Sequence, residues 1–385
     1  MVRALFCLAS LGLAAAGQSA AAQATIEEAS AATISAVYTA DAWRNLSGGA
    51  RAGATYLDNF DLVAAFDAER SLGLTGTTAQ VSLLYNNRKT FSDRYAGDLQ
   101  TISNIDTDGS LRLYEAWVDH DFGAGAVKVG VIDLNSEFDV NETGALFINS
   151  SHGIGPEFSQ VGANGPGVFP IPALGGRLAL RHGQAELKLG VFEGTPGDSA
   201  RPRRTVLKLE RGEGSLTVVE ATARTDDGLR LGAGWWRHGG SPREGLRAAH
   251  GAYAIAEKRL LGGKRGSLSA FVRTGMARGR TYQVASYQGL GLALQAPLLT
   301  GAEEQLGLAV ASVRNSRSFR RAQSAAGSSS DARETALEMT YRTRLTPWLA
   351  LQPDLQYILN PGTDPSRRNA VAVGLRVELG WTWSR

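Results

Sequence analysis

The chain has 385 residues, with 40 basic against 37 acidic side chains, a formal net charge of +3, 46 glycines, 12 prolines and one cysteine. This composition suits a large ordered protein and excludes a disordered tail, a disulfide scaffold and a zinc module. The net charge is too small to argue for nucleic-acid binding. Many glycines, few prolines and the lack of an apolar run of about 20 residues favour a chain of many strands.

The first 22 residues have the features of a cleaved signal peptide. Arg3 provides a positive start, residues 4–16 form an apolar run, and three alanines at 20–22 precede Gln23 with the spacing of a cleavage site. The run is too short for a spanning helix, which needs about 20 apolar residues. The alternative is an ordinary buried N-terminal helix. We predict a signal peptide over residues 1–22 and one exported domain over 23–385, which has no cysteine because Cys7 is removed.

Apolar and polar side chains alternate along several segments of the exported domain. In residues 335–345, Leu337 and Met339 fall on one side and Glu338 and Arg342 on the other. This period of two is typical of strands with one polar and one apolar face. Segments with the same alternation are residues 174–181, 186–191, 349–357 and 371–383.

Three features favour an outer-membrane barrel over a soluble β-sandwich, whose polar face would be turned to water. The strands are long, and charges recur at the centre of their polar faces. Tight glycine-containing turns at 182–183 and 211–214 alternate with long polar stretches at 314–333 and 360–369. At about 20–23 residues per strand and connection, we predict an all-β, transmembrane antiparallel β-barrel of about 16 strands, with 18 possible.

Aromatic side chains gather in and near the last predicted strands. In barrels such residues sit at the two membrane interfaces. We expect interface positions for Tyr341, Trp348, Tyr357, Trp381 and Trp383.

The alternation fails after Ile132. Continuing the parity of residues 127–131 would point Asp133 and the following alternate polar residues into lipid, which carboxylates tolerate poorly. The strand must therefore end, or a bulge must reverse the register, near Ile132. Residues 147–172 are rich in Gly, Pro, Ser and Asn and long for a plain loop. We predict that this stretch folds inward and narrows the lumen; an external loop without contact to solute is the alternative.

Six segments carry longer motifs: residues 99–106 (LQTISNID), 111–122 (LRLYEAWVDHDF), 129–140 (VGVIDLNSEFDV), 146–160 (LFINSSHGIGPEFSQ), 168–178 (VFPIPALGGRL) and 345–362 (LTPWLALQPDLQYILNPG). In this order they resemble the OprB family of carbohydrate-selective porins, from about Ser47 to the C-terminus. The resemblance implies a 16-stranded outer-membrane barrel that passes sugars by diffusion through a constriction formed by inward loops. It also implies that the inward segment contains Asn135, Glu137, Asn149 and His152.

A passage for neutral sugars needs hydrogen-bond donors and acceptors that replace water and still release the solute. Charges of both signs supply them and keep the net field low, and the planar fork of arginine can donate to two adjacent hydroxyls. The alternative for each charge is that it only pairs across strands and stiffens the wall. Inward-facing candidates on the predicted strands are Arg88, Glu115, Arg177, Arg181, Glu186, Lys188, Lys208, Glu338, Arg342, Arg344, Asp354 and Gln356.

Motifs of enzymes are missing from the sequence. It contains no G-x-S-x-G, H-E-x-x-H, P-loop or dinucleotide fingerprint. Asp133, Asn135 and Glu137 have the spacing of a calcium loop, but Phe138 stands where that loop needs glycine. We predict no catalytic residues, no metal and no cofactor. The alternatives to a sugar porin are a general or anion-tolerant diffusion porin, a closed structural barrel, and a hydrolase on a barrel, with His152 beside two serines.

The expected location is the outer membrane of a Gram-negative bacterium. The expected partners are sugars as permeant solutes, outer-membrane lipid and lipopolysaccharide, and the barrel-assembly machinery, with no nucleic acid. The barrel could be a monomer or a homotrimer.

Overall fold

The computed structural model describes residues 30–198, 201, 204–207, 212–263, 266–279, 282–301 and 303–384. The predicted signal peptide and Lys208 lie outside these residues. Sixteen strands run through the described part of the chain: β1 (Ala32–Ser47), β2 (Gly53–Asp67), β3 (Thr77–Asn86), β4 (Leu111–Asp121), β5 (Gly125–Ile132), β6 (Ala173–His182), β7 (Ala185–Glu193), β8 (Ser215–Arg224), β9 (Leu229–His238), β10 (Ala249–Gly263), β11 (Gly266–Arg278), β12 (Val284–Gln295), β13 (Glu303–Asn315), β14 (Arg333–Thr346), β15 (Leu349–Leu359) and β16 (Ala370–Ser384).

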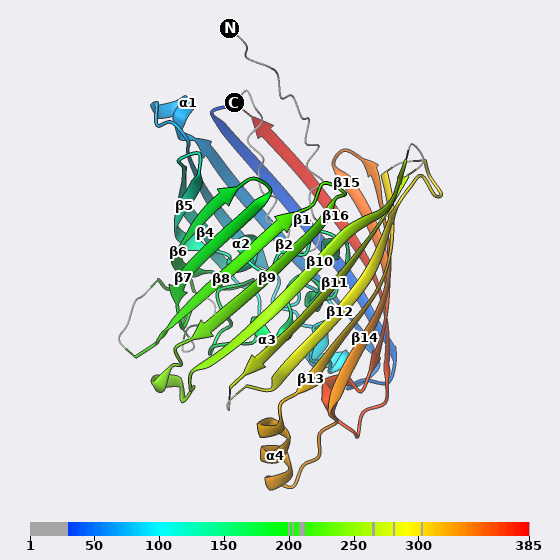
Figure 1. Cartoon of the computed structure of the whole chain (residues 1–385). Coiled ribbons are helices and arrows are strands. Elements are labelled where there is room, and N and C mark those ends of the chain that lie inside the picture. Colours follow the sequence, from blue (N-terminus) through cyan, green and yellow to red (C-terminus); the bar gives the residue numbers. More distant parts are fainter. Residues whose placement is uncertain are drawn as a thin grey trace.

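The strands close into one barrel (Figure 1). Each strand pairs antiparallel with its neighbours in sequence, and β1 pairs with β16 to complete the ring. In the described residues, no helix combines the length and the apolar character that crossing a membrane requires. The helical segments are α1 (Ala68–Leu72), η1 (Ser92–Ala96), α2 (Leu134–Glu137), η2 (Gly144–Leu146), η3 (Ser150–His152), α3 (Pro156–Ser159), η4 (Pro242–Glu244), α4 (Arg317–Ala325) and η5 (Pro361–Thr363).

The outer wall of the barrel is apolar and the inner wall polar, because successive side chains of a strand point to opposite faces. On β14, Leu337 and Met339 are 39% and 47% exposed on the outside, whereas Glu338 and Thr340 are buried inside. The predicted barrel is confirmed, with 16 rather than 18 strands. The strands have 8 to 16 residues. Many are longer than the roughly 9–11 residues that cross a bilayer, because they are tilted and continue beyond the membrane.

The two ends of the barrel differ in their connections. The C-terminus and the start of β1 lie at the end with mostly short turns, such as residues 183–184 and 225–228, which is the periplasmic end of such barrels. The predicted tight turn at 211–214 is wrong: these residues close a 194–214 connection, in which glycines 212 and 214 have positive φ before β8 begins. The long connections, all at the opposite and external end, are residues 87–110, 133–172, 194–214, 239–248, 316–332 and 360–369.

The aromatic side chains lie toward both ends of the barrel. Trp348, Trp381 and Trp383 are exposed near the periplasmic end. Tyr357 lies on β15 toward the external end and accepts a hydrogen bond from Asn369 at 2.9 Å. Tyr341, on the periplasmic half of β14, is half-buried and its hydroxyl donates to Glu304.

Replacing Trp381 and Trp383 together by alanine should impair membrane assembly. Both lie on β16, opposite Ala36 and Ile34 of β1, in the pair of strands that closes the ring. An open strand edge cannot persist in hydrocarbon, and interfacial aromatics anchor the strand. The amount of heat-modifiable barrel in the outer membrane measures the effect. Trp235→Ala, an exposed tryptophan on β9, is the control; full assembly of the double variant would contradict this role.

Candidate functional site

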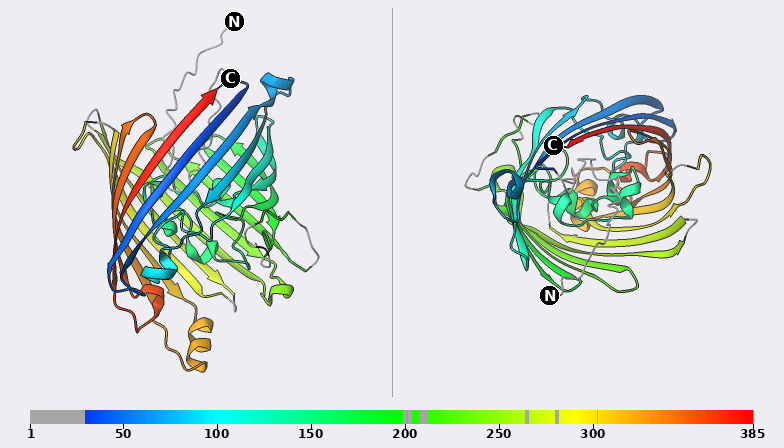
Figure 2. Two further views of the ribbon diagram at one scale, coloured as in Figure 1. Left: turned by 180° about the vertical axis from the view of Figure 1, so that it is seen from behind. Right: turned by 90° about the horizontal axis from the view of Figure 1, so that it is seen from above.

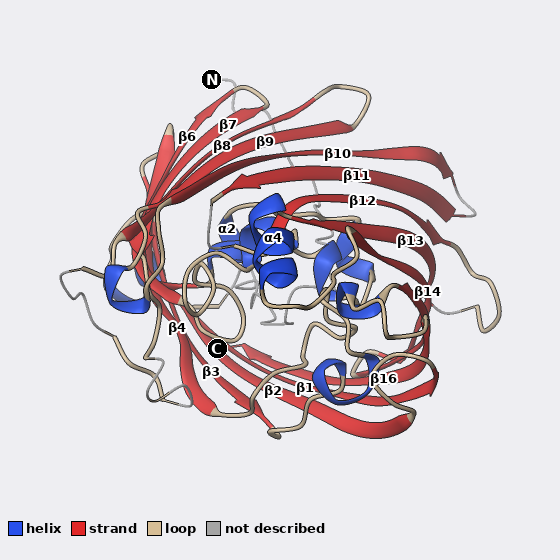
Figure 3. Cartoon of the chain, turned by 90° about the horizontal axis from the view of Figure 1, so that it is seen from below, coloured by secondary structure: helices blue, strands red, loops and turns tan. Residues whose placement is uncertain are grey.

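The connection between β5 and β6, residues 133–172, lies inside the barrel (Figures 2 and 3). It starts at the end of β5, Ile132, as the parity break predicts. Asp133 caps α2 by accepting a hydrogen bond from the Asn135 N–H at 2.9 Å. The short helices α2, η2, η3 and α3 then carry the chain across the lumen. The predicted inward fold is confirmed, and residues 133–172 are called the constriction segment below.

Glu137 anchors the start of the constriction segment to the wall. Its carboxylate accepts a hydrogen bond from Arg177 Nε on β6 at 2.8 Å and pairs with Lys128 on β5. Arg177 also donates to Asp119 of β4 at 2.9 Å. Lys188 of β7 donates to the Glu137 carbonyl at 2.6 Å. Arg177 and Lys188 thus hold this segment, which matches the alternative that wall charges pair rather than meet solute.

Arg273 on β11 forms a deeply buried anchor. Its Nη2 lies 2.6 Å from Asp139 Oδ2, and its Nη1 lies 2.6 Å from Glu157 Oε1. All three side chains are at most 3% exposed. Gly155 makes this approach possible, because a Cβ there would lie 1.9 Å from Arg273 Nη1. One arginine therefore neutralises two carboxylates that come from separate parts of the constriction segment.

Strands β9 and β10 hold the middle of the constriction segment through its backbone. Arg230 donates to the Val140 carbonyl at 2.9 Å and forms an ion pair with Glu257. Glu257 in turn accepts a hydrogen bond from the Thr143 N–H at 2.6 Å. These contacts satisfy backbone groups that an inward loop would otherwise bury without partners.

The far side of the constriction segment is held by β14 and β15. Glu338 accepts hydrogen bonds from the N–H groups of Ile148 and Asn149 at 2.6 and 3.1 Å. The Asn149 side chain donates to Gln356 at 3.0 Å. Gln352 donates to the Leu146 carbonyl at 2.7 Å. The segment is therefore anchored on both sides of the lumen.

A second connection, residues 87–110 between β3 and β4, also contacts the lumen wall. Glu334 of β14 accepts from the N–H groups of Leu99 and Gln100 at 2.8 and 3.1 Å. Arg376 of β16 donates to Asn104 at 2.7 Å. A hollow of about 200 Å³ lies between this connection and the constriction segment. This hollow is thus bounded by two clamped connections.

The family model that matches this chain is described as "Carbohydrate-selective porin, OprB family" and covers residues 51–242 and 238–380. The chain belongs to the OprB family. Its fold and family make it a channel rather than an enzyme, located in the outer membrane of a Gram-negative bacterium. The predicted resemblance is confirmed.

Known relatives of this OprB-family chain share the barrel. Porin B of Pseudomonas aeruginosa is 23% identical over 393 residues, 89% of this chain and 86% of that protein. The high-pH structure of Pseudomonas putida OprB has a TM-score of 0.78 at 18% identity, covering 91% of this chain and 94% of that one. An anion-selective porin from Comamonas acidovorans has a TM-score of 0.55 at 14% identity, covering 91% and 100%. Because the fold alone does not fix selectivity, selectivity must be argued from residues.

The remaining predicted pore residues of the OprB-family barrel fall into two groups. Glu115 lies inside, where it accepts hydrogen bonds from Asp133 N–H and Gln80 at 3.1 and 2.9 Å. Asp354 is also buried inside and accepts from Gln356 at 3.1 Å.

The second group lies near the ends of the barrel. Arg88 is exposed in the connection after β3, with φ +64°, so it is not on a strand wall. Arg181 pairs with Asp121 and Glu186 and is 41% exposed near the periplasmic end. Arg342 pairs with Glu378, and Arg344 with Glu303.

Sequence reasoning missed the strongest anchors of the porin. Arg273, Arg230 and Glu257 were not among the predicted residues. Their signal was present, because in residues 271–276 the polar Arg273 alternates with outward Val272 and Met276. The sequence does not show which residue Arg273 pairs with, because its partner Asp139 is 134 residues away along the chain.

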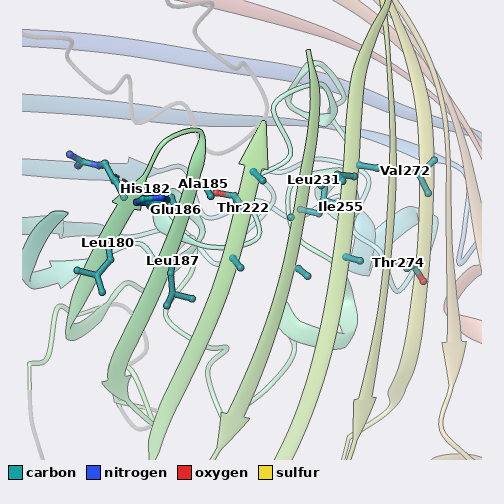
Figure 4. A pocket seen from close by; sticks show the side chains of 17 residues that line it. Leu180, His182, Ala185, Glu186, Leu187, Thr222, Leu231, Ile255, Val272 and Thr274 are labelled. Carbon is teal, nitrogen blue, oxygen red and sulfur yellow. Dashed lines mark hydrogen bonds and ion pairs between the residues drawn. The ribbon is translucent and has the colours of Figure 1, made fainter. Parts of the chain in front are cut away.

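A hollow of about 620 Å³ lies on the outer face of the barrel (Figure 4). Leu180, Leu187, Leu231 and Val272 surround it, with alanines of β8 to β10 at its floor. Small side chains on the lipid-facing side of the strands produce this depression. It is separate from the lumen and is not part of the permeation site.

His152 should make docking of the constriction segment pH-dependent. Its ring lies 5.0 Å from Phe147 and 5.8 Å from Phe271, with Nε2 3.5 Å from Glu338. Burial lowers the pKa of His152 from 6.5 to about 3. Between pH 6.5 and about pH 3, His152 is protonated when the constriction segment is released but neutral when the segment is docked. Docking therefore weakens as the pH falls through this range.

The test compares protease cleavage of the segment in the wild type and in His152→Phe between pH 7 and pH 4. The wild type should lose more protection on acidification than the variant, since both share all other titrating groups. Parallel pH curves for the two proteins would contradict the role of His152.

Proposed function

We propose that this porin passes neutral mono- and small oligosaccharides into the periplasm by passive diffusion between the constriction segment and the 87–110 connection. The observation that carries the proposal is the pairing of the lumen charges. Arg177, Arg230 and Arg273 each form a close ion pair with a carboxylate beside the constriction segment. Such paired charges leave little net field to select ions.

Uncharged polar groups line the space between the two connections. Gln100, Asn104 and Asn135 line the hollow between the two connections, and hydroxyl groups lie among them. A sugar hydroxyl both donates and accepts, so amides and hydroxyls can replace its water at low cost and still release it. An anion would find acceptors but no basic side chain in this lining.

Planar-bilayer recording with titrated sugars tests the proposal. We expect a conducting channel with weak ion selectivity whose current falls reversibly when glucose or maltose is added. A silent bilayer would favour a closed structural barrel. Strong anion selectivity without sugar block would favour the anion-tolerant alternative.

A variant with residues 150–155 replaced by a short Gly-Ser linker should conduct more and be blocked less by sugar, because it removes η3 from the lumen. A linker of the same composition replacing residues 324–329, in the exposed 316–332 connection, is the control. Wild-type conductance and block in the lumen variant would contradict the proposed passage.

We also propose that residues 1–22 are removed on export and that the barrel-assembly machinery inserts the chain beside lipopolysaccharide. The apolar run and the alanine triplet before Gln23 support the cleavage. N-terminal sequencing of the outer-membrane form would test it. A homotrimer and a monomer remain the two predicted assemblies, and cross-linking in the membrane would distinguish them.

A further inference from the structure

The 200 Å³ hollow is formed only by the two inward connections. Its lining residues come from 99–106 and from 133–170, with none from the wall strands. Pockets for drug-sized ligands are larger, roughly 300–1,000 Å³. The hollow therefore has the size for one small ring rather than for an extended chain.

Several polar groups at the hollow are not engaged elsewhere. The hydroxyls of Thr101, Ser150 and Ser159 form no side-chain hydrogen bond within the described part of the chain, and these residues are only half-buried. A half-buried hydroxyl without a protein partner can exchange its hydrogen bond to water for one to a ligand hydroxyl.

One side of the hollow is apolar and flat. Phe169 and Pro170 line it together with Ile154. The Phe169 ring packs edge-on against Tyr114, with centroids 6.4 Å apart. Tyr114 is fixed in turn because its hydroxyl donates to Asp133 at 2.6 Å. The aromatic face is thus held in place at the edge of the hollow.

The charge of the hollow disfavours ionic ligands. Among the described lining residues, Asp106 and Asp133 are the ionisable groups, and there is no lysine, arginine or histidine. Burial raises the pKa of Asp106 to about 7 and that of Asp133 to about 6. Near pH 6 the hollow therefore carries little charge, and what charge it carries is negative.

We infer that this hollow is a binding subsite for one neutral sugar ring, which packs its C–H face on Phe169 and hydrogen-bonds Ser150 and Ser159. The inference rests on the proposed sugar permeation and locates one sugar-binding subsite along the permeation path. An aromatic side chain together with free hydroxyl groups matches a pyranose, whose ring face is apolar and whose rim carries hydroxyls. Binding there is weak enough for release because few groups contact the sugar.

The test uses glucose block of single porin channels in planar bilayers at pH 6. Phe169→Leu keeps apolar volume and removes the flat face, and Ser150→Ala with Ser159→Ala removes two hydroxyls. Each change should raise the glucose dissociation constant about three- to ten-fold, mainly through faster release. Conductance without sugar should change little, because none of the three side chains anchors a connection. The matched controls are Phe122→Leu and Ser328→Ala with Ser329→Ala, which alter exposed residues far from the hollow along the chain.

The outcomes separate this subsite from sugar permeation itself. If the wild type shows no glucose block, the proposed function fails. If the wild type is blocked and both variants are blocked equally well, sugar permeation stands and the subsite is overturned. Tighter block by glucose 6-phosphate than by glucose would also overturn it, because the hollow offers no cation. If Phe169→Leu does not give a heat-modifiable barrel, glucose block of the variant with Ser150→Ala and Ser159→Ala tests the subsite.

Discussion

Replacing Arg273 by alanine should release the constriction segment and raise single-channel conductance several-fold. The change leaves Asp139 and Glu157 buried without their cation. Breaking a buried ion pair by removing one partner costs about 3–5 kcal/mol, and here two carboxylates lose the same partner. Moving the segment away from the wall lets both carboxylates reach water. The barrel should persist, because its backbone hydrogen bonds do not depend on Arg273.

Conductance and sugar block in planar bilayers measure this effect, with protease cleavage of the constriction segment as a second readout. Arg273→Lys should fall between the wild type and the alanine variant, since lysine keeps the charge and loses the two-sided fork. Arg278→Ala, an exposed arginine on the same strand, is the control. An alanine variant with wild-type conductance and protection would show that other anchors suffice.

Breaking the Arg376–Asp41 pair should destabilise the closed barrel. Asp41 of β1 and Arg376 of β16 are directly opposite in register, and Arg376 Nε and Nη2 bind the two carboxylate oxygens at 2.7 and 2.9 Å. Both side chains are buried, at 0% and 5% exposure. Either single alanine variant leaves one unpaired charge inside, at a cost of about 3–5 kcal/mol. Arg376→Ala also frees the 87–110 connection, which Arg376 holds through Asn104.

The temperature at which the heat-modifiable band unfolds reports this loss. The double variant Asp41→Ala, Arg376→Ala should lose less than the two single losses added together, because it leaves no unpaired charge. Arg368→Ala, exposed in the 360–369 connection, serves as control. Additive losses would mean that the two side chains act independently despite their geometry.

The sequence predicted those features that depend on one strand at a time. Alternation in residues 335–345 identifies which face of β14 meets lipid, since the pleat puts successive side chains on opposite sides. The parity break after Ile132 located the start of the constriction segment for the same reason. Turn assignment from local glycines succeeded at 183 and failed at 211–214, because a glycine permits a turn whether it ends a short or a long connection.

The roles of individual lumen charges depended on contacts between distant strands. Arg177 has the same inward position whether it meets a sugar or neutralises Glu137, and the sequence alone allowed both. Asp139 and Arg273 are 134 residues apart, and only the closed barrel brings them within hydrogen-bonding distance. Side-chain periodicity was enough to predict the barrel, its polar lumen and the segment that leaves the wall, because each of these follows from which face of a strand a residue occupies. The tertiary structure alone decided which charges clamp that segment and which polar groups stay free beside it, because ion pairing depends on distances between strands that periodicity does not encode.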